Sequence, residues 1–277
     1  ASDVYKRQVF KVGAMLYSLY ISFTEWNLFG APEFVGLKNY ITIFRDPRFY
    51  ESLKNTLLFI AGYLPVVLVL SMGIALLLNS KVKRVNIFRG LFFLPVITSW
   101  VAVSMIWKGL LNPEFGIINS IIEFFGGTGP AWLQDPAFVL PSVIMVSVWK
   151  DVGFLSIIFL GGLQGISSEY YEAAQIDSAS KWQQFRKITL PLLSPTTFYA
   201  LIITIINSFQ VFDQIWIMTA GEPTADLVPV MVTEIYKNSF QYQKMGYATA
   251  LSWILFAIII GVTIFQNVMQ KKWVHYE

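Results

Sequence analysis

The stretch EYYEAAQIDSASKWQQFRKITLPLL, residues 169–193, contains six charged residues and three glutamines between two long apolar runs. Each neighbouring run reaches the roughly 20 apolar residues that a helix needs to cross a lipid bilayer. Charged side chains are costly inside a bilayer, so the segment between two such helices belongs at a membrane surface. We therefore predict a helical membrane protein in which residues 169–193 form a compact polar segment at that surface.

The first half of this stretch predicts a short helix. Ser167 or Ser168 can cap it, because a serine hydroxyl accepts hydrogen bonds from the free backbone N–H groups at a helix start. Glu169 follows directly, and its carboxylate suits the positive end of the helix dipole. The helix would run to about Asp177.

The second half predicts another helix. Ser180 and Gln183 have the spacing of a capping box, in which each side chain bonds the backbone N–H of the other residue. This helix would stop before Pro191, because proline breaks the helical hydrogen-bond ladder. The apolar residues of the two helices are Ala173, Ala174, Ile176, Ala179, Trp182, Phe185 and Ile188. They could partly pack inward, as in an ordinary amphipathic loop, or their alanines could let a partner approach closely.

The composition of the whole chain agrees with a membrane protein. Of its 277 residues, 55% are hydrophobic and 13% are charged, whereas soluble domains have about 25% charged residues. The mean hydropathy is +0.57. The net charge of +3 is modest and its basic residues cluster in short loops, which indicates membrane topology and not nucleic-acid binding.

Five apolar runs, including the two beside residues 169–193, are long enough to span a membrane: residues 56–78, 88–111, 139–163, 196–220 and 246–269. Residues 12–23 form a shorter run after the polar start ASDVYKRQ. We interpret this run as a truncated first span and residues 1–8 as non-native or disordered; a native short N-terminus before a half-inserted helix is the alternative. The expected fold is all-α, with six membrane helices in one domain, residues 1–277.

The distribution of basic residues predicts which side each loop occupies, because short cytoplasmic loops are enriched in Lys and Arg. The basic residues expected in the cytoplasm are Lys81, Lys83, Arg84, Arg89, Lys181, Arg186, Lys187, Lys271 and Lys272. Residues 112–136 contain no Lys or Arg and are expected outside. The first outer loop balances four basic residues against four acidic ones. Residues 37–55 and 115–125 are amphipathic and are expected to be helices lying on the outer membrane surface.

Most enzymatic chemistry is excluded by what the sequence lacks. There is no G-x-x-x-x-G-K-[ST] phosphate-binding loop, no G-x-G-x-x-G, no G-x-S-x-G and no H-E-x-x-H. Cysteine is absent and the sole histidine is His275, so a zinc site and a Cys–His pair are excluded. We expect a protein that is not an enzyme and that carries no cofactor or metal.

Polar residues inside the predicted spans are candidates for a substrate path, because such residues are costly in lipid. In the fifth span, Asn207, Gln210 and Gln214 are spaced to share one helical face, and Asp213 borders it. The fourth span adds candidates with aromatic or charged side chains: Trp149, Lys150, Asp151 and Phe154. Amides and carboxylates bond sugar hydroxyls, and aromatic rings stack on sugar rings. Alternatively, the amides join helices, and Lys150 forms a structural pair with Asp213 or reaches the outer interface.

One motif carries a resemblance to a known family. Glu172-Ala173-Ala174, three residues, Ser178, nine residues and then Ile188-x-Leu190-Pro191 resembles the EAA loop of binding-protein-dependent ABC transporter permeases. The family pattern has glycine where this chain has Ser178. If that position requires a positive φ, serine would strain the turn by roughly 1 kcal/mol or more.

Other segments are similar to the sugar-uptake branch of these permeases, the maltose and glycerol-phosphate type. They are FVGLKNY (34–40), NPEFGIIN (112–119), WLQDP (132–136), VFDQIWIMTAG (211–221) and GYATALS (246–252). TAGEP (219–223) departs from the usual T-x-G-G-P, so the outer loop after the fifth span is expected to differ.

The resemblance implies a permease subunit of an ATP-driven importer in a bacterial or archaeal cytoplasmic membrane, with a carbohydrate or sugar derivative as cargo. The implied partners are a second permease, two ATPase subunits and an extracytoplasmic binding protein. Residues 164–191 would be the cytoplasmic coupling loop, with these contact residues for the ATPase: Glu172, Ala173, Ala174, Asp177, Ser178, Ile188, Leu190 and Pro191. The family's substrate contacts lie on the fourth and fifth spans. An ion-driven secondary transporter, or a permease for other cargo, is the alternative.

Overall fold

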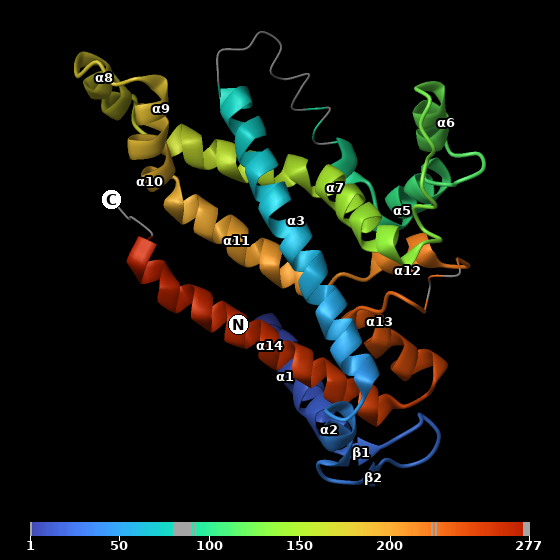
Figure 1. The fold of residues 1–277 in the computed structure, drawn as a ribbon. Helices are drawn as coiled ribbons and strands as arrows, with labels where there is room; N and C mark the ends of the chain where they lie inside the picture. The colour runs from blue at the N-terminus through green and yellow to red at the C-terminus, as the bar shows by residue number, and fades with distance from the viewer. Residues whose placement is uncertain are drawn as a thin grey trace. The chain divides into compact units, whose positions relative to one another are not determined.

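The computed structural model describes residues 2–79, 90, 92, 94–222, 224 and 226–273, and these residues are almost entirely helical (Figure 1). The helical elements are α1 (Ser2–Ser22), α2 (Lys38–Ile43), α3 (Pro47–Asn79), α5 (Trp100–Leu110), α6 (Ile117–Phe124), α7 (Pro136–Gly165), α8 (Ser168–Ile176), α9 (Lys181–Gln184), the π-helical turn η1 (Phe185–Thr189), α10 (Leu190–Leu192), α11 (Ser194–Phe209), α12 (Asp213–Thr219), α13 (Met231–Tyr236), the π-helical turn η2 (Lys237–Gln241) and α14 (Met245–Trp273). Strands β1 (Thr24–Glu25) and β2 (Glu33–Phe34) form a short antiparallel ribbon. The backbone is thus already helical from Ser2, within the segment expected to be non-native or disordered.

Three helices are long and apolar enough to cross a membrane. They are α3, α7 and α14, and they contain the predicted spans 56–78, 139–163 and 246–269. α3 begins earlier than expected, because Pro47 suits a helix start and the Asp46 carboxylate accepts a hydrogen bond from the Arg48 N–H at 2.9 Å. The predicted surface helix over residues 37–55 is therefore wrong in part: α2 ends at Ile43, and the remainder belongs to α3.

Two predicted spans are not continuous helices. In the run 88–111, residues 94–97 are helical, Thr98 and Ser99 are not, and α5 starts at Trp100. The Ser99 hydroxyl caps α5 by accepting from the Ala102 N–H at 3.2 Å, which favours a new helix start there. In the run 196–220, α11 ends at Phe209 and α12 begins at Asp213, whose carboxylate suits a first turn.

In the described part of the chain, fewer helices than the six predicted spans meet the length and hydropathy of a membrane span. This part holds three candidate membrane helices, or four if Lys181–Leu192 and Ser194–Phe209, which are bent by 62° relative to each other, form one broken span. The six-helix arrangement stays a prediction. Lys81, Lys83, Arg84, Arg89 and His275 lie outside the described residues.

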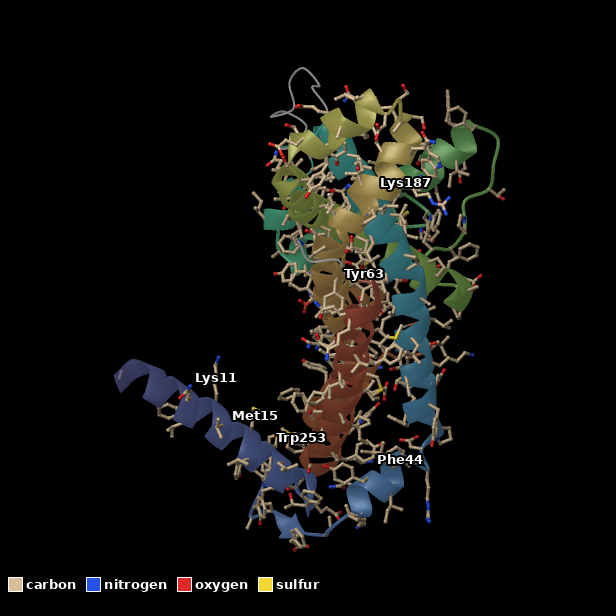
Figure 2. All side chains as sticks on the ribbon, turned by 90° about the vertical axis from the view of Figure 1, so that its left-hand side faces the viewer. Lys11, Met15, Phe44, Tyr63, Lys187 and Trp253 are labelled. Atoms are coloured by element: carbon tan, nitrogen blue, oxygen red, sulfur yellow. The ribbon has the colours of Figure 1, made fainter. Side chains whose placement is uncertain are left out.

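The chain divides into two compact units. The first comprises Ala1–Leu57, Phe209–Phe212 and Val228–Val262, and the second comprises Leu58–Ser208, Asp213–Leu227 and Thr263–Glu277. In the first, α1 meets α14 where the Trp253 indole N–H donates to the Ser18 hydroxyl at 3.3 Å, close to Met15 (Figure 2). In the second, α12 packs against α5 and α7.

Candidate functional site

The 169–193 stretch forms two short helices with the capping that its sequence predicts. α8 has Ser167 as its N-cap, and the Ser167 hydroxyl accepts from the Glu169 N–H at 3.3 Å. α9 has the complete capping box: the Gln183 N–H donates to the Ser180 hydroxyl at 3.3 Å, and the Ser180 N–H donates to the Gln183 side-chain oxygen at 2.7 Å. Local sequence is therefore sufficient to define both helix starts.

The turn between α8 and α9 requires a left-handed residue, and Ser178 supplies it with φ +57°. The Ser178 N–H donates to the Gln175 carbonyl at 3.0 Å, and the Ala179 N–H donates to the Ala174 carbonyl at 2.9 Å. This pair of bonds is the Schellman arrangement that normally ends on glycine. A residue with a Cβ pays roughly 1–2 kcal/mol for the left-handed conformation, so serine carries a small local strain where the family pattern has glycine.

The second helix does not stop before Pro191, contrary to expectation. It continues from α9 through η1 and α10 to Leu192. Within η1 the Leu190 N–H donates to the Phe185 carbonyl, which is the wider i→i+5 spacing of a π-helix. Pro191 follows directly in the first turn of α10, and such π-helical turns re-space the backbone hydrogen bonds of a helix.

Side chains hold the two helices together. The Tyr171 hydroxyl lies 3.0 Å from the Thr189 hydroxyl, and the Gln184 amide donates to the Ala179 carbonyl at 3.0 Å. These bonds join α8, the turn and the second helix. A bend of 62° separates Lys181–Leu192 from α11.

α8 buries none of its residues within the chain. Ile176 is 85% exposed and Trp182 is 67% exposed, so these two side chains do not pack inward. Ala174, Ala179, Phe185 and Ile188 are half-buried, as partial inward packing of the segment predicts. Among the predicted coupling residues, Glu172, Ala173, Asp177, Ser178 and Leu190 are exposed, while Ala174, Ile188 and Pro191 are half-buried. A small, apolar and acidic surface therefore faces away from the chain.

Lys150, a candidate for the path or for a pair with Asp213, contacts the break in the apolar run 88–111. Its side chain is 5% exposed, and its ammonium donates to the Pro95 and Val96 carbonyls at 3.2 and 3.3 Å. It also lies 4.9 Å from the centre of the Trp100 ring. Carbonyls freed at a helix end inside a membrane need such a donor. Among the described residues, no ion pair joins Lys150 to Asp213.

The other candidates on α7 point in different directions. The Asp151 carboxylate accepts a hydrogen bond from the Tyr63 hydroxyl of α3 at 2.7 Å. Trp149 packs edge-on against Trp107 of α5, with 5.4 Å between ring centres, and remains partly exposed, as does Phe154. Tyr63 and Trp107 were not found from the sequence, because only the folded chain brings α3 and α5 to α7.

The candidate residues of the run 196–220 lie on three different backbone elements. Asn207 is in the last turn of α11, Gln210 is in the break and Asp213 is the first residue of α12; all three are exposed, while Gln214 is buried. The prediction that Asn207, Gln210 and Gln214 share a helical face is therefore wrong, because the helix ends at Phe209. Within the described ranges, no group of three or more His, Asp or Glu side chains could hold a metal ion.

A second basic contact lies where TAGEP departs from its expected pattern. Lys108 at the end of α5 pairs with the Glu222 carboxylate at 3.4 Å and donates to the Ala220 carbonyl. Gly221 before it has φ +76°. The Glu222 side chain thus connects the loop after α12 to α5, and the glycine of the usual T-x-G-G-P pattern could not make this contact. The unexpected charge at position 222 was the only sign of the contact in the sequence.

Comparison with known proteins identifies similar chains. A family model described as "Binding-protein-dependent transport system inner membrane component" matches residues 72–275. "Probable ABC transporter permease protein YesP" of Bacillus subtilis (strain 168) is 36% identical over 272 residues, covering 97% of this chain and 87% of that protein. "Probable starch degradation products transport system permease protein AmyD" of Thermoanaerobacterium thermosulfurigenes is 31% identical over 256 residues, covering 92% and 86%.

Two solved structures also resemble this chain. One is a bacterial ABC transporter "involved in the import of the acidic polysaccharide alginate", with a TM-score of 0.82, 25% identity, and coverage of 98% of this chain and 99% of that one. The other is a bacterial alginate ABC transporter "in complex with alginate pentasaccharide-bound periplasmic protein", with a TM-score of 0.78, 27% identity, and coverage of 86% and 83%.

Proposed function

Because the chain belongs to the family of binding-protein-dependent transport system inner membrane components, we propose that it is the permease subunit of an importer for a carbohydrate or sugar derivative. The observation that carries the proposal is the family match over residues 72–275, which includes the 169–193 stretch. Relatives named for starch degradation products and alginate support a carbohydrate cargo. The chain is a transport subunit and not an enzyme.

The transporter is a multi-subunit complex. This chain has no phosphate-binding loop, so ATP hydrolysis comes from two separate ATPase subunits. A second permease completes the membrane pathway, and an extracytoplasmic binding protein delivers the cargo. The alginate transporter solved with a periplasmic protein supports this last partner.

The 169–193 segment and the C-terminal tail lie in the cytoplasm. Helix geometry supports opposite sides for the two ends of α14, because 29 residues extend about 43 Å and the hydrocarbon core is about 30 Å thick. Lys271 lies at one end of α14, and the loop before Met245 lies at the other. Basic residues favour the cytoplasmic side, so the β1–β2 ribbon and residues 242–246 are extracytoplasmic.

The exposed face of α8 is the contact for an ATPase subunit. Ala173 allows close approach, Glu172 offers a charge, and Ile176 and Trp182 offer apolar area that the chain itself leaves uncovered. Closure of the ATPases on ATP would move this segment as a body, and the connection after Leu192 would pass the motion to α11. The transporter then alternates between two states whose populations ATP shifts.

Asn207, Gln210 and Asp213 contact the cargo, as do the α7 residues Trp149, Asp151 and Phe154. Replacing Asn207 or Gln210 by alanine should raise the KM for uptake several-fold, because a lost sugar hydrogen bond costs about 1 kcal/mol, while basal ATP hydrolysis persists. Reconstituted transport measures both quantities. Thr197→Ala, about three turns earlier in α11, is the control. Unchanged uptake kinetics in both amide variants would remove Asn207 and Gln210 from the path.

The proposed function is tested by reconstituting the co-purified complex with its binding protein in liposomes. Uptake of a saccharide should require ATP and stop with vanadate, because the energy comes from hydrolysis. Uptake that continues without ATP but collapses with the ion gradient would instead show a secondary transporter. ATP-driven uptake of amino acids, peptides or phosphate, and of no saccharide, would leave the permease assignment and overturn the cargo.

A further inference from the structure

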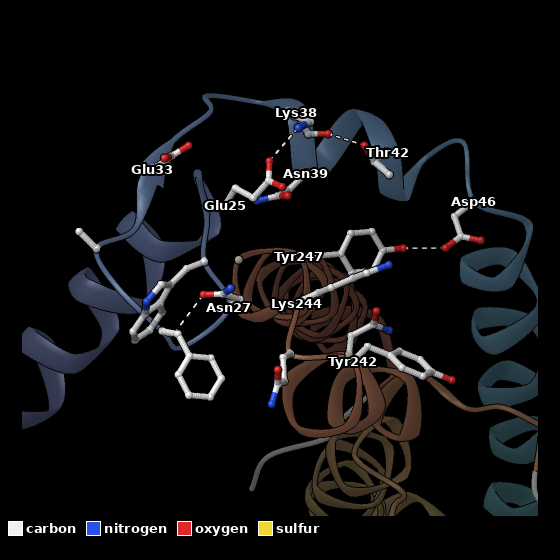
Figure 3. A pocket seen from close by; sticks show the side chains of 16 residues that line it. Glu25, Asn27, Glu33, Lys38, Asn39, Thr42, Asp46, Tyr242, Lys244 and Tyr247 are labelled. Atoms are coloured by element: carbon white, nitrogen blue, oxygen red, sulfur yellow. Dashed lines mark hydrogen bonds and ion pairs between the residues drawn. The ribbon is translucent and has the colours of Figure 1, made fainter.

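A pocket of about 730 Å³ lies within the first unit, at the end of the helices that we place outside (Figure 3). Its walls come from two distant parts of the sequence, residues 25–46 and residues 238–247. This volume is within the range of about 300–1,000 Å³ that small-molecule sites have. None of the coupling or path residues lines the pocket, so neither role accounts for it.

Two segments that the resemblance singled out, FVGLKNY and GYATALS, meet at this pocket. The Asn39 amide donates to the Ser22 and Thr24 carbonyls, both at 2.9 Å. A Cβ on Gly246 would lie 1.8 Å from the Thr24 carbonyl oxygen, so only glycine allows α14 to approach the ribbon this closely. The Met245 N–H donates to the Trp26 carbonyl at 2.9 Å. The two walls are therefore locked together by backbone contacts.

The polar groups of the pocket are held in fixed positions. The Asp46 carboxylate accepts from the Tyr247 hydroxyl at 2.8 Å, and the Glu25 carboxylate pairs with the Lys38 ammonium at 2.8 Å; Figure 3 shows both contacts at its rim. Gln243 lines the pocket in the left-handed conformation, with φ +54°. Such strain at a ligand-facing position persists only where the surrounding structure enforces it. The Asp46 acceptor is thus oriented by Tyr247 before any ligand arrives, which lowers the cost of binding, whereas the Glu25–Lys38 pair is exposed to solvent.

Aromatic side chains that are not buried in the hydrophobic core line the same pocket. Phe29 is 70% exposed and Tyr242 is 55% exposed, and Trp26 and Tyr247 contribute two further rings. Exposed rings beside oriented carboxylates suit a ligand that has both apolar faces and a polar edge. A sugar ring has this chemistry: C–H groups on its faces and hydroxyls around its rim.

We propose that this pocket is an extracytoplasmic saccharide subsite, which holds a sugar ring of the cargo before it enters the membrane pathway. The proposal rests on the proposed function, because it takes the cargo and the outward orientation from there. Phe29 and Tyr242 stack on the ring faces, and Asp46 and Glu25 accept hydrogen bonds from the hydroxyls. Two of the carboxylates that line the pocket already have a partner within the chain, because Asp46 accepts from the Tyr247 hydroxyl and Glu25 pairs with Lys38.

The experiment uses the complete complex in liposomes with maltotriose, arabinotriose and an alginate trisaccharide as probes. Phe29→Ala and Tyr242→Ala should raise the KM of whichever trisaccharide the unchanged complex imports by about three- to tenfold, as expected for a lost stacking contact, with ATP hydrolysis retained. Matched controls are Phe34→Ala and Phe240→Ala. Both residues are equally exposed aromatics of the same segments, 69% and 62%, that do not line the pocket, and their uptake should be unchanged.

The possible outcomes distinguish a failure of the proposed subsite from a failure of the proposed function. Import of a trisaccharide with the same KM in all four variants would overturn the subsite and leave the proposed function standing. A weaker affinity of the sugar-free binding protein for Phe29→Ala and Tyr242→Ala complexes would show a protein-docking surface instead, and would also overturn it. ATP-dependent import of amino acids, peptides or phosphate, and of no saccharide, by the unchanged complex would overturn the proposed cargo and the subsite with it.

Discussion

Replacing Glu172 by lysine should uncouple ATP hydrolysis from uptake. Glu172 is exposed on α8, and none of the ion pairs among the described residues involves it, so the change leaves the fold intact. At a docked surface it would turn an attraction into a repulsion, and disrupting a buried interfacial charge pair costs about 2–5 kcal/mol. Uptake should fall more than tenfold while the ATPase subunits still hydrolyse ATP.

The measurement compares uptake, ATP hydrolysis and co-purification of the ATPase in one preparation. Glu123→Lys, at an exposed position on α6, reverses the same charge away from the proposed contact and should transport normally. Ser178→Gly removes the left-handed strain of the turn and should keep coupling, because the Schellman bonds need only backbone. Normal uptake and normal ATPase association in the Glu172→Lys complex would contradict docking through this face.

Replacing Lys150 by methionine should destabilise the protein by about 1–3 kcal/mol. The buried ammonium donates to the Pro95 and Val96 carbonyls. The Pro95 carbonyl also accepts from the Thr98 N–H at 3.3 Å, so the main loss is at the Val96 carbonyl, and a buried polar group left without a partner costs about 1–3 kcal/mol. Methionine roughly keeps the length and apolar stem of lysine, so the loss reflects the missing donor and not a cavity. Thermal denaturation of the purified complex in one detergent gives the shift in Tm.

Lys108→Met is the matched control for this measurement. The side chains of Lys108 and Glu222 are 30% and 17% exposed, and water can replace part of such a contact, so its loss should cost less than the loss of Lys150. Lys150→Arg, which keeps donors but changes their geometry, should fall between the two. Equal Tm values for Lys150→Met and the unchanged complex would show that these carbonyls do not depend on Lys150.

The sequence alone predicted the elements that depend on neighbouring residues. Apolar runs of sufficient length became α3, α7 and α14, and the serines at 167 and 180 mark the starts of α8 and α9. These features are local, because capping uses backbone groups within three residues and span length follows from composition. The motif over residues 172–191 also predicted the family that the comparison shows.

The sequence could not predict where the helices break, or which groups then bond the backbone carbonyls that the break leaves free. The runs 88–111 and 196–220 were expected to be straight, yet one breaks at Thr98 and Ser99 and the other at residues 210–212. As a result, Asn207, Gln210 and Gln214 do not share a face. The path and coupling roles of the candidate residues stay predictions, because side chains in one chain show position but not what they bind.

By itself, the sequence determined an apolar helical chain, interrupted by one polar segment whose two helices are capped by serines. The tertiary structure decided the rest, for one physical reason: a polar group in or near a membrane is costly unless another group satisfies it. Lys150 permits the break before α5 because it reaches the freed carbonyls. Likewise, residues 25–46 form a pocket only because Gly246, some 200 residues later, lets α14 approach them.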